Sequence, residues 1–144
     1  MNGIYEMIRF FAENISFNLK NRRRIKYWIA DAIIGENKII GEINFIFCSD
    51  DYLLDMNRKY LSHDYFTDVI TFDFCEGDKI SGDIFISIDS VRSNSAKYGQ
   101  SFANELYRVM IHGILHLCSY GDSTKPETAL MRSKENIYLE KLVI

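Results

Sequence analysis

The chain has 144 residues, of which 47% are hydrophobic and 26% charged, and it contains a single proline. This length and composition predict one domain over residues 1–144 with a sizeable core, and they exclude a disordered or collagen-like chain. The formal net charge of −3 gives no indication of a nucleic-acid partner, although residues 1–30 alone carry a charge of +4.

Strands and helices alternate along the chain without an internal repeat or a linker. Scattered apolar and aromatic residues in 5–19 favour a strand. In residues 22–34 the apolar positions recur at helical spacing, which predicts a helix. Apolar and polar residues alternate in 41–49, which predicts a strand, and the sequence Ser-Asp-Asp at 49–51 can cap a short helix that runs to Tyr60.

Two further strands and two long helices complete the expected elements. The strands cover residues 67–74 and 82–89, and Asp89 at the end of the second strand can cap the next helix. The helices cover residues 101–117 and 126–142, the latter opened by a proline that suits a first turn. This order predicts an α+β or α/β fold, and we favour α+β with a small mixed β-sheet flanked by helices.

The three cysteines are odd in number and lack the paired spacing of a disulfide framework or a zinc ribbon, so we expect the reduced thiols Cys48, Cys75 and Cys118. No apolar run approaches the roughly 18 residues of a membrane span. The first ten residues lack the basic-then-apolar order of a secretion signal. We therefore expect a cytoplasmic location and no membrane partner.

Two of the three histidines lie one helical turn apart in the segment IHGILHLCSYGD. His112 and His116 share a helix face and can aim two imidazole nitrogens at one point, although a histidine on an apolar helix is more often a core residue. Gly121 can adopt the left-handed conformation that ends a helix, so the chain can turn back and present Asp122 to the same point. Two imidazoles and one carboxylate suit one Zn²⁺ ion with a fourth position open for water.

Three other kinds of metal site fit the sequence less well. Helical zinc proteases place a glutamate base directly after the first histidine, and here that residue is Gly113, which we expect to leave room for a bulky substrate. Cys118 points about 200° around the helix from His116, so we interpret it as a core thiol. An Fe(II) oxygenase also uses two histidines and a carboxylate, but the sequence indicates no cosubstrate site.

The run HGILHLCSYGD resembles the signature H-G-x-L-H-L-x-G-Y-D-H of the YbeY family, bacterial metal-dependent endoribonucleases of rRNA maturation. TDVITF at 67–72 and GDIFIS at 82–87 are similar to two strands of that family, and Met131 and Glu135 are similar to positions of its last helix. The resemblance covers roughly residues 40–141.

The sequence departs from the family pattern at several positions. The family's third histidine falls on Asp122, and its glycine and aspartate become Ser119 and Gly121. The arginine that the family carries before the TDV strand falls on Leu61.

The resemblance implies a zinc-dependent, single-strand-specific endoribonuclease that acts on the 3′ end of small-subunit rRNA and in ribosome quality control. The implied partners are rRNA and ribosomal proteins or a ribosome-associated GTPase. The alternative is a non-catalytic, metal-stabilised ribosome-biogenesis factor that binds rRNA or ribosomal protein, because Leu61 stands where RNA contacts by an arginine are expected.

Other residues carry weaker expectations. Asp68 and Asp83 are interpreted first as caps or turn formers of their strands. The functional alternative is that either one is a hydrogen-bond partner of a ligand histidine or a proton-transfer group, and neither is assigned as the general base. His63 is interpreted as a loop residue. For the run NRRRIK we prefer a solvated helix start over a basic patch that faces an RNA backbone. The candidate contacts to an RNA backbone are Arg22, Arg23, Arg24, Arg58 and Lys59.

Overall fold

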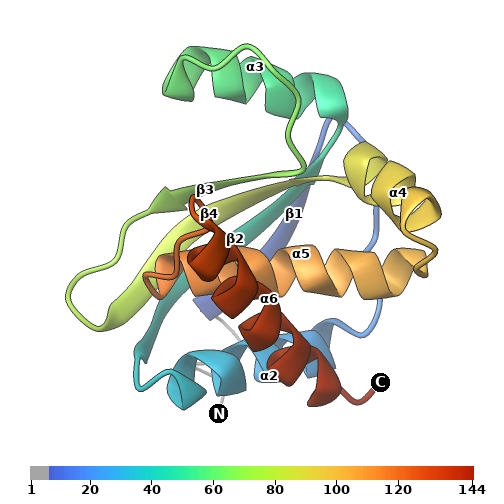
Figure 1. Ribbon diagram of the computed structural model, residues 1–144. Coiled ribbons are helices and arrows are strands. Elements are labelled where there is room, and N and C mark those ends of the chain that lie inside the picture. Colours follow the sequence, from blue (N-terminus) through green and yellow to red (C-terminus); the bar gives the residue numbers. More distant parts are fainter. Residues whose placement is uncertain (1–6) are drawn as a thin grey trace.

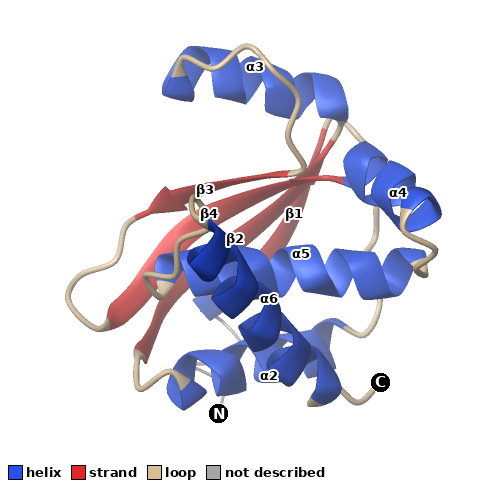
Figure 2. Ribbon diagram, viewed as in Figure 1, coloured by secondary structure: helices blue, strands red, loops and turns tan. Residues whose placement is uncertain are grey.

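The computed structural model describes residues 7–144, and within them four strands form one mixed sheet in the order β1-β2-β4-β3 (Figures 1 and 2). β1 (Ile8–Glu13), β2 (Ile39–Cys48) and β4 (Lys79–Ser87) run parallel, and β3 (Val69–Asp73) pairs antiparallel with β4. The predicted α+β fold with a small mixed sheet is therefore confirmed. Residues 1–6 lie outside the described part of the chain. They include most of the first ten residues, in which no secretion signal is expected, and the start of the strand predicted in 5–19.

Five helices accompany the sheet in the described part of the chain: α2 (Arg22–Gly35), α3 (Asp50–Leu61), α4 (Ile88–Lys97), α5 (Phe102–Leu117) and α6 (Lys125–Glu140). α3 covers one face of the sheet, whereas α2, α5 and α6 lie on the other side, with α5 against the strands (Figure 1). Within residues 7–144, none of these helices combines the length and the apolar character that a membrane crossing requires.

Side chains of β4 point alternately to the two helical layers. Ile84 and Ile86 are fully buried in the larger core on the side of α5, whereas Phe85 packs in a smaller cluster with Leu53 of α3. Helix α5 approaches β4 closely at Gly113, where an added Cβ atom would lie 2.8 Å from Cγ2 of Ile84. The expectation that this glycine leaves room for a substrate is therefore wrong, because it faces the sheet.

Most helices begin where the sequence predicts. The hydroxyl of Ser49 accepts from the backbone of Tyr52 and caps α3, and α6 begins with a capping box of Thr124 and Glu127. The predicted cap at Asp89 is wrong, since the N-cap of α4 is Ser87 at the end of β4. Ser87 is itself a favoured cap residue whose hydroxyl accepts from the backbone of Ser90 at 3.2 Å, and the carboxylate of Asp89 accepts from the backbone of Asp50 instead.

The three cysteines are free thiols, as predicted. Cys118 is buried in the core next to α5, which confirms its interpretation as a core thiol. Burial raises the pKa of Cys48 and Cys118 to about 12. Both thiols are therefore protonated and poor metal ligands at neutral pH.

Candidate metal centre

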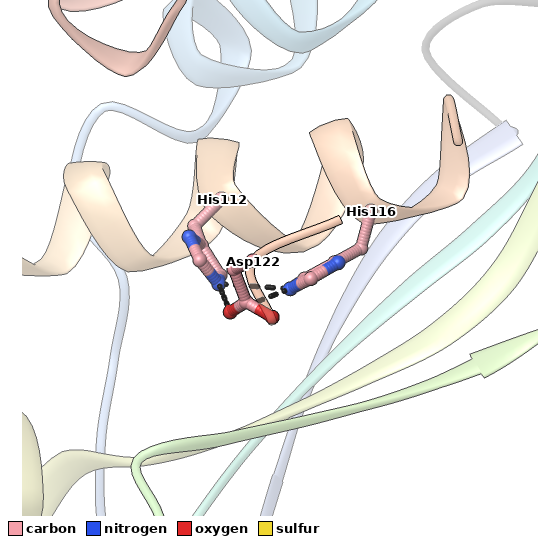
Figure 3. Close-up of side chains that lie close together, drawn as sticks. All are labelled: His112, His116 and Asp122. Atoms are coloured by element: carbon pink, nitrogen blue, oxygen red, sulfur yellow. Dashed lines mark hydrogen bonds and ion pairs between the residues drawn. The ribbon is translucent and has the colours of Figure 1, made fainter. Parts of the chain in front are cut away.

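Helix α5 and the loop after it bring three side chains to one point (Figure 3). The Nε2 atoms of His112 and His116 lie 3.0 Å apart. The Oδ2 atom of Asp122 lies 3.4 Å from the first of these nitrogens and 3.3 Å from the second. The convergence predicted from the sequence spacing is thus present in the structure.

The hydrogen bonds at Nδ1 select, for each neutral imidazole, the tautomer whose Nε2 atom carries an electron pair. Nδ1 of His116 lies 2.9 Å from the carbonyl oxygen of Tyr120, and because a carbonyl only accepts, this nitrogen carries the proton. Nδ1 of His112 lies 2.7 Å from a carboxylate oxygen of Glu135 and donates to it in the same way. Two nitrogen electron pairs and the carboxylate of Asp122 therefore face one another, an arrangement that a cation stabilises.

The separations of the three atoms also fit a metal ion. In a tetrahedral zinc site with bonds of about 2.0–2.1 Å, neighbouring ligand atoms lie about 3.3 Å apart. The separations of 3.0, 3.3 and 3.4 Å between the Nε2 atoms of His112 and His116 and Oδ2 of Asp122 are close to this value. The donor set fits one divalent ion with room for further ligands.

The loop after α5 turns back through Ser119, not through Gly121. Ser119 has a φ of +79°, and its N–H and that of Tyr120 each donate at 3.0 Å to carbonyls of the last helical turn, which is a Schellman ending. The prediction that Gly121 supplies the left-handed residue is therefore wrong. Gly121 instead provides space, because an added Cβ atom would lie 2.4 Å from a carboxylate oxygen of Glu127.

Glu135 on α6 holds the first imidazole in place. Its second carboxylate oxygen accepts from Arg108 at 2.8 Å, and its side chain is buried. Burial favours the neutral acid, but hydrogen bonds from His112 and Arg108 outweigh it and lower the pKa of Glu135. Burial likewise opposes protonation of His112, yet the hydrogen bond and charge of Glu135 outweigh it and raise the pKa of His112.

Sequence reasoning did not identify Glu135 as part of the site, although a signal for it exists. Glu135 lies between Met131 and Tyr138 at helical spacing, and all three are buried. A glutamate on the apolar stripe of an amphipathic helix requires a partner, because a buried charge without one is costly. The sequence does not reveal that this partner is His112.

The two aspartates that the sequence offered as partners lie in different places. Asp68 and the buried Glu105 line a cavity of about 590 Å³ together with His112, and burial raises the pKa of both carboxyl groups. The next residue of β4, Ile84, faces α5, so Asp83 points to the other face of the sheet. There its carboxylate accepts from the side chain of Asn44 at 3.0 Å. The structure does not bring Asp83 to the histidines.

A model of the family described as Endoribonuclease YbeY matches residues 8–143. The chain belongs to the YbeY endoribonuclease family. Two relatives named Endoribonuclease YbeY, from Phocaeicola vulgatus and Flavobacterium psychrophilum, are 48% and 50% identical over 130 residues, which cover 90% of this chain and 94% and 92% of theirs. A solution structure of a Thermotoga maritima protein matches with a TM-score of 0.67 at 28% identity, covering 94% of this chain and 89% of that one.

The cations that line the cavity beside the candidate metal centre differ from those proposed as RNA contacts from the sequence. The cavity is lined by Arg108 and Arg132, and the side chain of Arg132 is 62% exposed. The lining includes none of the five cations expected to contact RNA, which are Arg22, Arg23, Arg24, Arg58 and Lys59. Arg108 and Arg132 lie 24 residues apart in the sequence, so they form no basic cluster that would have marked them as RNA contacts.

The last residue of α3, Leu61, takes the position of the family's arginine, and the loop of residues 62–68 connects this helix to β3. Leu61 is 38% exposed, and the neighbouring Arg58 and Lys59 form ion pairs with Asp64 and Asp55. His63 lies in the same loop, as predicted, and hydrogen-bonds through Nδ1 to the hydroxyl of Tyr65 at 3.0 Å.

Proposed function

We propose that this chain is a zinc-dependent endoribonuclease that cleaves single-stranded RNA, with the 3′ end of small-subunit rRNA as its substrate. The observation that carries the proposal is the convergence of His112 Nε2, His116 Nε2 and Asp122 Oδ2 within 3.0–3.4 Å, with both Nδ1 atoms already hydrogen-bonded. Membership of a family whose relatives are named endoribonucleases supports hydrolysis of phosphodiester bonds.

In this proposal His112, His116 and Asp122 hold one ion, and the protein supplies the surroundings. When bound, the ion supplies Lewis-acid chemistry at the phosphodiester and lowers the pKa of water. Glu135 keeps the His112 ring in the orientation that metal binding needs. Asp68, in the adjoining cavity with its pKa raised by burial, can hold a proton at its carboxyl group.

The RNA backbone is held by cations in two regions. Arg132 is exposed in the cavity beside the ion site, where its guanidinium can bind a phosphate next to the cleaved bond. The five cations Arg22, Arg23, Arg24, Arg58 and Lys59 lie outside the cavity lining and would contact phosphates farther along the strand. The proposal includes work in the cytoplasm, in ribosome quality control, together with ribosomal proteins or a ribosome-associated GTPase.

The decisive experiment combines metal analysis with cleavage of end-labelled rRNA fragments. We expect one zinc per chain, loss of cleavage with a chelator and recovery with added zinc. Asp122→Ala should reduce cleavage at least about 100-fold, whereas Asp122→His should retain it because imidazole is an equally good zinc ligand. Asp78→Ala, in an exposed turn, is the matched control. Cleavage that is insensitive to the chelator and to Asp122→Ala would refute the proposal.

A non-catalytic ribosome-biogenesis factor is the second candidate, and one observation favours it. Leu61 occupies the position of the YbeY arginine, and the nearest cations, Arg58 and Lys59, are paired with aspartates. RNA held only weakly near the ion would suit a binding role. If Asp122→Ala still binds rRNA and supports ribosome maturation in cells that lack the wild-type protein, this second candidate replaces the first.

A further inference from the structure

The loop after α5 contributes two groups to the metal centre. The carbonyl oxygen of Tyr120 accepts from Nδ1 of His116 at 2.9 Å and so fixes which ring nitrogen faces the ion site. Two residues later, the carboxylate of Asp122 supplies the third ligand atom. The position of this one loop therefore determines both the tautomer of an imidazole and the place of a carboxylate.

The side chain of Tyr120 ties this loop to a distant part of the chain. Its hydroxyl donates to Oε1 of Glu36 at 2.6 Å, and Glu36 is the C-cap residue of α2. Tyr120 is thus held at both ends, by His116 through its backbone and by Glu36 through its phenol. Glu36 precedes Tyr120 by 84 residues, so this contact depends on how α2 packs near the loop.

The carboxylate of Glu36 is itself held firmly. Its other oxygen, Oε2, accepts from Lys134 Nζ at 3.2 Å and from the hydroxyl of Tyr138, both on α6. The side chain of Glu36 is only 9% exposed. Burial favours the neutral acid, but the hydrogen bonds from Tyr120, Tyr138 and Lys134 outweigh it and lower the pKa of Glu36.

We infer that Glu36 is a positioning residue for the metal centre and acts on His116 through Tyr120. This inference rests on the proposed metal site, which Glu36 does not enter. A carboxylate that accepts three donors from two elements is a rigid anchor, and the Tyr120 ring transmits its position to the carbonyl that orients His116. Without the anchor the loop retains its backbone hydrogen bonds but has more freedom to rotate about them.

The structure offers a matched pair of variants to test the inference. Tyr120→Phe and Tyr138→Phe each remove one phenol hydrogen bond to the same carboxylate, but only Tyr120 contacts His116. We expect Tyr120→Phe to weaken zinc binding about three- to tenfold, below the about 10–100-fold typical of a direct partner of a ligand histidine. Tyr138→Phe should change zinc affinity less than twofold, even if urea unfolding shows that both variants lose similar stability.

Two further measurements separate positioning from general loosening. Glu36→Ala should weaken zinc binding in the wild-type background and have no further effect in Tyr120→Phe, whereas Glu36→Gln, whose amide can still hydrogen-bond to the Tyr120 hydroxyl, should weaken zinc binding less than Glu36→Ala does. In the metal-free protein, nitrogen NMR should show His116 protonated at Nδ1 in the wild type and a mixture of tautomers in Tyr120→Phe.

The outcomes distinguish this inference from the proposed function. The role of Glu36 would be overturned if Tyr120→Phe changed neither the zinc affinity nor the tautomer of His116. It would also be overturned if Tyr138→Phe lost as much zinc affinity as Tyr120→Phe, and in both cases the metal site would remain in place. Wild-type protein that binds no zinc would instead refute the proposed metal site. In that case the tautomer of His116 in the metal-free variants would still decide whether Glu36 acts through Tyr120.

Discussion

Replacing Glu135 with glutamine tests the metal centre most directly. The wild-type carboxylate accepts from His112 at 2.7 Å and from Arg108 at 2.8 Å, and both of these partners are donors. A glutamine has one acceptor oxygen and one donor nitrogen, so whichever way the amide is turned, one of the two hydrogen bonds is lost. We expect zinc affinity to fall about 10–100-fold, which corresponds to about 1.4–2.7 kcal/mol, because the amide either loses the hydrogen bond to His112 or keeps it and loses the Arg108 bond that holds the side chain in place.

The same change should destabilise the metal-free protein. Removing a buried, charge-assisted hydrogen bond costs about 1–3 kcal/mol, which urea unfolding with and without a chelator can measure. Zinc affinity would be determined by competition with a chromogenic chelator. Glu140→Gln, the same charge change at an exposed position of α6, is the control and should alter neither quantity. Wild-type zinc affinity in a folded Glu135→Gln protein, or an equal loss in Glu140→Gln, would refute the reasoning.

Three further outcomes follow from the local geometry. Ser119→Gly should raise the free energy of unfolding by about 1 kcal/mol, because Ser119 has a φ of +79° that costs a side chain energy; no gain in the urea midpoint would contradict this. Gly113→Val should lower stability by about 2 kcal/mol or more, since its Cβ would lie 2.8 Å from Ile84; a wild-type thermal midpoint would count against it. Cys48 and Cys118, whose pKa burial raises to about 12, should resist alkylation at pH 8 until the protein is unfolded, as mass spectrometry of labelled peptides can show.

Local sequence patterns determined the elements and the ligand helix of this protein. A spacing of four residues places His112 and His116 on one face of any regular helix. Asp122 follows His116 by only six residues in the sequence, which limits how far its carboxylate can lie from the imidazoles. A serine signal located the start of α3 and a proline that of α6 for the same reason, since both act within the first turn of a helix. The misplaced cap at Asp89 shows that the local pattern does not decide between two nearby residues, Ser87 and Asp89, that both suit a cap.

Tertiary packing alone decided which groups surround the ligands. Glu135 is 23 residues from His112, and Glu36 is 84 residues from Tyr120, so neither hydrogen bond follows from any period in the sequence. Both faces of the sheet are covered by helices, and alternation in a strand therefore leaves open which face Asp83 takes. Periodicity determines which side chains share one face of a helix or strand. The contacts between elements depend on how the whole core packs, and the hydrogen-bond partners of the metal centre come from those contacts.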